Sequence, residues 1–179
     1  MKHAYSKSIS FAAMLILSLV PSAADCQELF GGLFAHDVAI TRSQTIERGE
    51  DLELGVRLDP ILPSLGKPRP QLAVLANSAG GANFASAGLS WKLGRRIYLR
   101  PSVGIAVHTG DVHVTPTFLA RHRIPFGSAV LFAPAIAAGV RISDRISLEA
   151  AWLHFSNAGL FSNTNPGIDD VGLALSLRF

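Results

Sequence analysis

The chain of 179 residues contains a single cysteine, Cys26, and few charged residues. One cysteine excludes an intramolecular disulfide, and no histidines, cysteines or acids stand at the spacing of a metal-binding motif. The sequence therefore predicts no metal site and no cofactor. Charged residues make up only 16% of the chain, whereas hydrophobic residues make up 49%. This balance is unusual for a soluble domain.

Long hydrophobic runs are also absent after the N-terminal segment. Two lysines precede an apolar run over residues 9–20, which is too short to span a bilayer as a helix. The small residues Ser22-Ala23-Ala24 then supply a cleavage site, so residues 1–24 are predicted to be a secretory signal peptide. Removing them takes away two lysines and no acid, which lowers the formal net charge from +3 to +1. The charge of the remaining chain therefore gives no support for nucleic-acid binding. We expect residues 25–179 to form a single exported domain.

Apolar and polar residues alternate over strand-length windows in the remaining sequence. Successive side chains of a strand point to opposite faces, so this pattern gives each strand one apolar face and one polar face. Short alternating segments separated by turns are typical of an outer-membrane β-barrel, whose apolar face contacts lipid. The apolar series are Leu52, Leu54, Val56 and Leu58; Ala85, Ala87, Leu89, Trp91 and Leu93; and Ile97, Leu99, Pro101, Val103, Ile105 and Val107.

Eight such segments predict an eight-stranded antiparallel transmembrane β-barrel of the bacterial outer membrane. A closed barrel leaves no free edge in the membrane, and side chains fill the interior of one this small. The connections 40–50, 109–126 and 158–167 are long and are predicted to lie on the cell exterior, whereas the Pro-rich connection 59–69 is an unexplained long periplasmic turn. The predicted strands are 28–39, 51–58, 70–78, 82–93, 96–108, 127–142, 145–157 and 168–179.

A candidate acyl-transfer site lies at the end of the seventh predicted strand. His154 and Ser156 are two residues apart and share a face, and Asp169 opens the last strand. In such a trio the histidine takes the serine proton and the acid orients the imidazolium. All three continue the lipid-facing parity of their strands, whereas Asp170 points inward. Polar groups facing hydrocarbon are costly unless they have a function, so the sequence predicts an esterase whose lipid substrate arrives from the membrane.

The same region resembles a known family. The segments His154-Phe155-Ser156-Asn157-Ala158-Gly159-Leu160 and Asn165-Pro166-Gly167-Ile168-Asp169 are similar to the active-site region of the outer-membrane lipid A 3-O-deacylases, the PagL type, also termed acyloxyacyl hydrolases. The resemblance covers most of the mature chain. Weaker similarity runs through Pro68-Arg69-Pro70, Asn77-Ser78-Ala79-Gly80, Ala87-Gly88-Leu89-Ser90-Trp91 and Ala106-Val107-His108-Thr109-Gly110.

The resemblance implies a role for each residue of the candidate site. It makes Ser156 the nucleophile, His154 the base and Asp169 the acid, where the best-known members carry Glu. It also points to Asn157 and to the backbone N–H of Gly159 as donors to the oxyanion. The implied substrate is the 3-linked primary acyl chain of lipid A, part of lipopolysaccharide in the outer leaflet of the outer-membrane bilayer. No cofactor is required by this chemistry.

Other functions stay open from the residues alone. A histidine and a serine at this spacing are commonly just a polar strand end near the lipid headgroups. One alternative is therefore a non-catalytic small barrel that serves membrane integrity or surface interaction, and another is a phospholipase with the same three residues. Trp91 and Trp152 are interpreted as interfacial or lipid-facing packing residues. A homodimer, the acyl-chain preference and latency in the native membrane are left open by the sequence.

Overall fold

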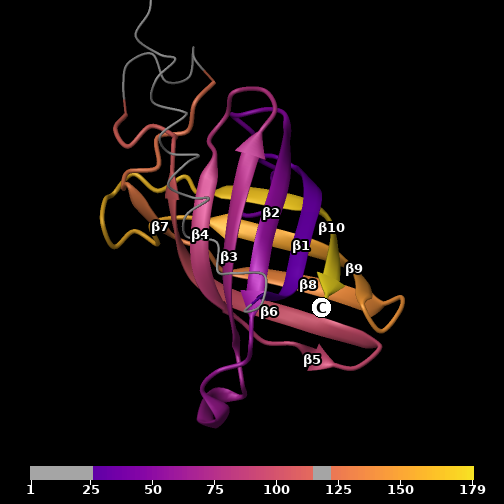
Figure 1. Cartoon of the computed structure of the whole chain (residues 1–179). Coiled ribbons are helices and arrows are strands. Elements are labelled where there is room, and N and C mark those ends of the chain that lie inside the picture. Colours follow the sequence, from indigo (N-terminus) through magenta and orange to yellow (C-terminus); the bar gives the residue numbers. More distant parts are fainter. Residues whose placement is uncertain (1–25, 115–121) are drawn as a thin grey trace, which may run out of the picture.

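The computed structural model describes residues 26–114 and 122–179, which form a twisted antiparallel barrel (Figure 1). The predicted signal peptide, residues 1–24, lies outside the described residues. None of the described residues forms a helix long and apolar enough to cross a membrane. The elements are β1 Cys26–Ala35, β2 Glu50–Leu58, the 3-10 helix η1 Pro63–Leu65, β3 Arg69–Asn77, β4 Phe84–Ser90, β5 Leu93–Gly94, β6 Ile97–His108, β7 Val130–Phe132, β8 Ala135–Arg141, β9 Ile146–Phe155 and β10 Ile168–Arg178.

Antiparallel pairing closes the sheet into a ring. β1 pairs with β10, which joins the first strand to the last, and β4 pairs with β6. β7 and β8 both pair with β6 and together form one strand of the barrel. This strand is interrupted at Ala133 and Pro134 because proline has no N–H for the ladder. The two-residue β5 only extends the turn before β6. Counted this way, residues 26–114 and 122–179 contain eight barrel strands, and the predicted eight-stranded barrel is confirmed.

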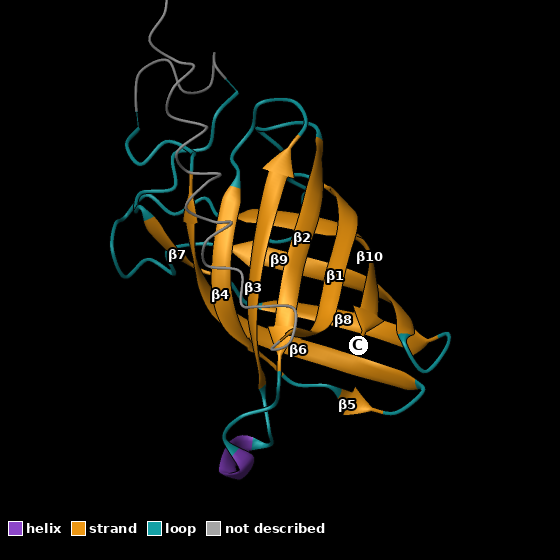
Figure 2. Ribbon diagram, in the orientation of Figure 1, coloured by secondary structure: helices purple, strands orange, loops and turns teal. Residues whose placement is uncertain are grey.

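The connections differ between the two ends of the barrel (Figure 2). One end, which we call the loop end, carries residues 36–49, 78–83, 109–114, 122–129 and 156–167. The opposite end carries the tight turns, the start of β1 and the end of β10. It also carries the Pro-rich connection, which contains η1. The long connections predicted from the sequence thus gather at one end, apart from this one.

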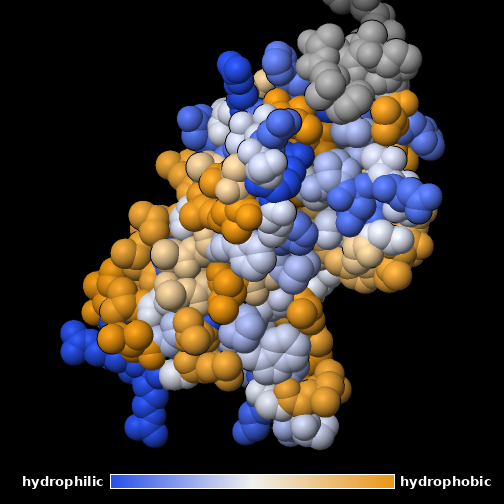
Figure 3. Space-filling model, turned by 180° about the vertical axis from the view of Figure 1, so that it is seen from behind, coloured by the Kyte–Doolittle hydropathy of each residue, from blue (hydrophilic) through white to orange (hydrophobic). Residues whose placement is uncertain are grey.

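The wall of the barrel has the predicted alternation of faces. Leu52 and Leu54 of β2 are 60% and 55% exposed, whereas Asp51 and Glu53, which alternate with them, are buried. Figure 3 shows hydrophobic side chains spread over the wall and hydrophilic side chains gathered near the two ends. An apolar belt between polar ends is what a lipid bilayer requires of a transmembrane barrel.

Charged side chains fill the lumen toward the end opposite the loops. Arg57 and Arg100 lie between Glu28 and Glu149 and form ion pairs with both carboxylates. Arg100 Nε is 2.8 Å from Glu149 Oε1, and Arg57 Nη2 is 3.1 Å from Glu149 Oε2. The Tyr98 hydroxyl donates a further hydrogen bond of 2.7 Å to Glu149. This buried network ties β1, β2, β6 and β9 together across the lumen.

An apolar core fills the lumen toward the loop end. The rings of Phe84 and Phe155 are stacked with centroids 4.2 Å apart, and Phe126 from the connection 109–129 packs edge-on against Phe84. The core therefore fixes the end of β9 from the inside. Its buried members are Leu75, Ala82, Phe84, Ala106, Ile124, Phe126, Leu131, Phe155 and Ile168.

Candidate active site

The end of β9 and the start of β10 bring the three candidate residues together. His154 Nε2 is 3.0 Å from Ser156 Oγ, and His154 Nδ1 is 2.8 Å from Asp169 Oδ1. Asp169 stands directly opposite His154 in the antiparallel ladder, as the parity of the two strands predicts. The neighbouring Asp170 is paired with Leu153 instead and faces the lumen. Serine, imidazole and carboxylate thus form one continuous hydrogen-bonded chain.

Phe155 explains why this chain lies on the outside of the barrel. Its ring is anchored in the apolar core, so the residues on either side of it, His154 and Ser156, must point to the opposite face. Trp152 continues this outer row, and its ladder partners Ile136 and Val171 are exposed on the wall. The Ser156 residue is 8% exposed and the His154 side chain 17% exposed, so the site is outward-facing but shielded.

Asp169 is fully buried and accepts hydrogen bonds on both carboxylate oxygens. Oδ1 accepts from His154 Nδ1 and from Trp152 Nε1, the latter at 2.9 Å. Oδ2 accepts from the Thr41 N–H at 2.7 Å and from the Thr41 hydroxyl at 2.6 Å. The Val38 N–H also donates to the backbone oxygen of Asp169, at 2.7 Å. Such donors favour the ionised carboxylate and fix its orientation.

Two of these contacts are not predictable from the sequence. Trp152 has the outward direction that its parity predicts, but beyond packing on the wall its indole N–H donates a hydrogen bond to the carboxylate of Asp169. Thr41 gives no signal at all, because it lies in a connection far from Asp169 in the sequence. The pairing of β1 with β10 brings that connection to the start of β10.

The turn after Ser156 is held by Asn157. Its side-chain Nδ2 donates to the backbone oxygens of Phe126 and Thr164, each at 2.8 Å, and its Oδ1 accepts the N–H of Gly159 at 2.7 Å. Both donors of the Asn157 side chain are therefore engaged inside the protein. Of the two expected oxyanion donors, Asn157 is buried and Gly159 is exposed.

Gly167 lies against the histidine ring. It has φ of +63°, a conformation that L side chains rarely adopt. A Cβ at this position would lie 3.1 Å from His154 Cε1 and 3.4 Å from Ser156 Cβ. The absence of a side chain thus lets the connection 156–167 close over the site without displacing His154.

Fold and site together define the class of this protein: a β-barrel of the bacterial outer membrane with a Ser-His-Asp constellation on its wall. The chain belongs to the lipid A 3-O-deacylase (PagL) family, whose sequence model matches residues 65–178. The family is one of hydrolases, and the matched residues include the three at the site. Thr41 lies outside the matched range.

Solved structures agree with this fold. The crystal structure of the outer membrane enzyme PagL is similar with a TM-score of 0.62 and 19% identity, covering 85% of this chain and 99% of that chain. A structure from the de novo design of transmembrane β-barrels has a TM-score of 0.52 and 10% identity, covering 87% and 97%. At these identities the structures show the fold alone. No curated protein sequence gives a significant match.

Proposed function

We propose that this protein hydrolyses the 3-linked acyl ester of lipid A, with Ser156 as nucleophile, His154 as base and Asp169 as orienting acid. The observation that carries the proposal is the hydrogen-bonded chain from Ser156 Oγ through His154 to Asp169 on the lipid-facing side of the barrel. Membership of the lipid A 3-O-deacylase family supports the choice of ester.

The reaction follows from this geometry in two halves. Ser156 Oγ attacks the ester carbonyl while His154 Nε2 takes its proton, and Asp169 stabilises the imidazolium through Nδ1. His154 then gives this proton to the departing sugar oxygen, which leaves as a hydroxyl, and the acyl group stays as an ester on Ser156. A water molecule attacks this ester while His154 takes its proton, and His154 returns that proton to Ser156 Oγ as the fatty acid is released.

The tetrahedral intermediate needs a donor for its oxyanion. We assign this role to the backbone N–H of Gly159, which is now hydrogen-bonded to the neutral amide oxygen of Asn157. An oxyanion is a stronger acceptor than a neutral amide, so the exchange of partners is favourable. Asn157 contributes by holding the turn through its own two donated hydrogen bonds.

The surroundings of Ser156 suit a substrate that arrives from the membrane. Leu160 and Phe161 follow Ser156 in the same connection and are 72% and 58% exposed, and the Phe161 ring stacks on Phe132 with centroids 5.8 Å apart. Phe132 is itself the bridge partner of Ser156. These apolar groups offer a surface for the acyl chain at the loop end of the barrel, which we assign to the outer leaflet.

Mass spectrometry of lipid A tests this function. Cells that produce the wild-type protein are expected to contain lipid A lacking one 3-linked hydroxyacyl chain, whereas cells with Ser156→Ala or His154→Ala are expected to keep it. Heat modifiability on gels checks that each variant is a folded barrel. Unchanged lipid A with the folded wild type would favour the non-catalytic barrel, and loss of phospholipid acyl chains instead would favour the phospholipase.

A further inference from the structure

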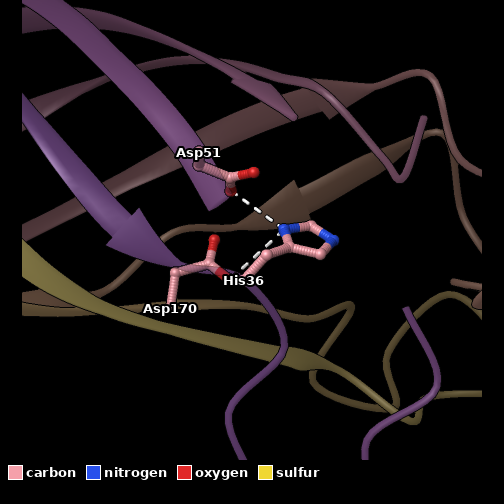
Figure 4. A group of neighbouring side chains, drawn as sticks. All are labelled: His36, Asp51 and Asp170. Carbon is pink, nitrogen blue, oxygen red and sulfur yellow. Dashed lines mark hydrogen bonds and ion pairs between the residues drawn. The ribbon is translucent and has the colours of Figure 1, made fainter. Parts of the chain in front are cut away.

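A second group of buried polar residues lies inside the barrel at the loop end, behind Asp169. His36 follows β1, Asp51 lies at the start of β2 and Asp170 at the start of β10, and these three strands are neighbours in the sheet. Figure 4 shows the two carboxylates converging on the imidazole. His36 Nδ1 is 2.9 Å from Asp51 Oδ2 and 3.6 Å from Asp170 Oδ1, and all three side chains are fully buried. One donor atom from each residue lies within 4.8 Å of the other two.

Glu47 fixes the orientation of the His36 ring. Its Oε2 is 3.0 Å from His36 Nε2 and also accepts the Ala82 N–H at 2.6 Å, while its Oε1 accepts the Ile124 N–H at 2.8 Å. A carboxylate with this many donors is an acceptor only, so His36 Nε2 carries a proton and Nδ1 faces the two aspartates. Histidines that bind metals are held in this way, with the second ring nitrogen donating to a carboxylate.

The two aspartates are anchored from outside the cluster as well. Asn77 Nδ2 donates to Asp51 Oδ1 at 2.9 Å, and the Asp37 N–H donates to Asp170 Oδ1 at 3.0 Å. Asp170 Oδ2 is buried and has no donor among residues 26–114 and 122–179. In Figure 4 this second oxygen points toward the Asp51 carboxylate. A buried carboxylate oxygen without a partner is costly, so a proton or a cation is needed between the two acids.

Charge balance allows either a divalent cation or protons between Asp51 and Asp170. Asp51 and Asp170 together bring two negative charges against one imidazole nitrogen, which either one divalent cation or two protons can neutralise. With protons and no ion between the acids, His36 Nδ1 lies at hydrogen-bond distance from Asp51 Oδ2, 2.9 Å. A cation must therefore take the place of the proton in this hydrogen bond.

We propose that His36, Asp51 and Asp170 form a binding site for one divalent cation, with Zn²⁺ as the best match. One imidazole nitrogen and two carboxylate oxygens are ligands that Zn²⁺ takes at about 2.0–2.2 Å, with water completing the tetrahedron. The ion is structural, because it ties the starts of β2 and β10 to the residue that begins the connection 36–49. Thr41 lies in that same connection. The ligands come from three separate strands, which is why their spacing in the sequence predicts no metal site.

Zinc titration of the complete folded barrel tests the proposal. The protein in detergent micelles is freed of metal with a chelator and titrated with ZnCl₂ by calorimetry, in a His113→Gln/His122→Gln background that removes two histidines of the long connection 109–129. We expect one saturable site per chain and a rise in the thermal midpoint. Mutation of a residue that only hydrogen-bonds to a metal ligand typically lowers metal affinity by about 10- to 100-fold. His36→Gln and Asp170→Asn remove ligands, so each is expected to weaken zinc binding by more than this. The control His108→Gln removes a different lumen histidine and is expected to bind zinc unchanged.

A spectroscopic measurement on the histidine-reduced background alone keeps the test decisive if the ligand variants do not fold. Zinc-edge X-ray absorption is expected to show only nitrogen and oxygen ligands, with the scattering pattern of one imidazole. Absence of saturable binding in the micromolar range would mean that protons fill the cluster and would overturn the proposal. Sulfur ligation, which would place the zinc on Cys26, or unchanged binding by both ligand variants would also overturn it.

Discussion

Replacing Thr41 by valine is expected to slow deacylation without weakening substrate binding. The threonine hydroxyl donates a hydrogen bond of 2.6 Å to Asp169 Oδ2, on the side of the carboxylate away from His154. Thr41→Val removes this donor and keeps the shape of the side chain. The carboxylate then loses one of the groups that hold it in line with the imidazole, so the step that forms the imidazolium becomes less favourable.

The size of the effect follows from the contacts of Asp169. A hydrogen bond to a charged group contributes about 1.5–3 kcal/mol, and about 1.4 kcal/mol corresponds to a tenfold change in rate. Thr41 is exposed and its backbone N–H keeps its own bond to Oδ2, so water replaces part of the lost interaction. We therefore expect kcat to fall by about tenfold, at the lower end of this range. Removing the charge altogether in Asp169→Asn is expected to cost about 10⁴-fold.

The assay is steady-state deacylation of purified lipid A in detergent, with kcat and KM measured separately. KM is expected to stay unchanged, because Thr41 contacts the acid and not the serine. Thr41→Ser is the matched control, since it keeps the hydroxyl and is expected to restore most of the turnover. A wild-type kcat in Thr41→Val, or equal losses in the valine and serine variants, would refute the positioning role of this contact.

Two further comparisons use neighbouring or matched residues. Asp169→Asn is expected to abolish turnover. Asp170 faces the lumen, so Asp170→Asn is expected to lower the thermal midpoint and keep most of the turnover. Equal losses of turnover at matched folded amounts would mean that the register of β10 is wrong. Gly167→Ala and Gly80→Ala both place a side chain at positive φ, which costs roughly 1–2 kcal/mol of stability. Only Gly167→Ala also puts a Cβ against the ring of His154. Turnover is therefore expected to fall only in Gly167→Ala, and equal turnover in the two variants would contradict the packing of that glycine on the site.

Much of this architecture is predictable from local pattern. Alternation with a period of two assigns both the strands and their faces, because a residue such as Leu54 or Glu53 has only two directions to point. The same parity predicts that Asp169 and not Asp170 meets His154, and the ladder has this register. The sixth predicted strand departs from regularity at Pro134, where it divides into β7 and β8.

The contacts that support the site are not predictable in this way. Thr41 reaches Asp169 only because the barrel closes by pairing its first and last strands, which is a long-range event. The convergence of His36 with the aspartates of two other strands has the same origin. The resemblance implies that Asn157 donates to the oxyanion, whereas in the structure its amide donates to two carbonyl oxygens of the surrounding loops, one of them in the distant connection 109–129. Parity gives the direction of a side chain in a strand but says nothing of loops that fold over it.

Covalent labelling of the serine tests the central claim most directly. A fluorophosphonate reacts with a serine only where a base activates the hydroxyl, and it forms a stable phosphonyl ester with loss of fluoride. Peptide mass spectrometry of the folded, detergent-solubilised barrel is expected to find one label, on Ser156, and lipid A deacylation is expected to fall in proportion to the labelled fraction. Full deacylation by protein that is completely labelled at Ser156, or inactivation by a label on another residue, would contradict the assignment of Ser156 as the nucleophile.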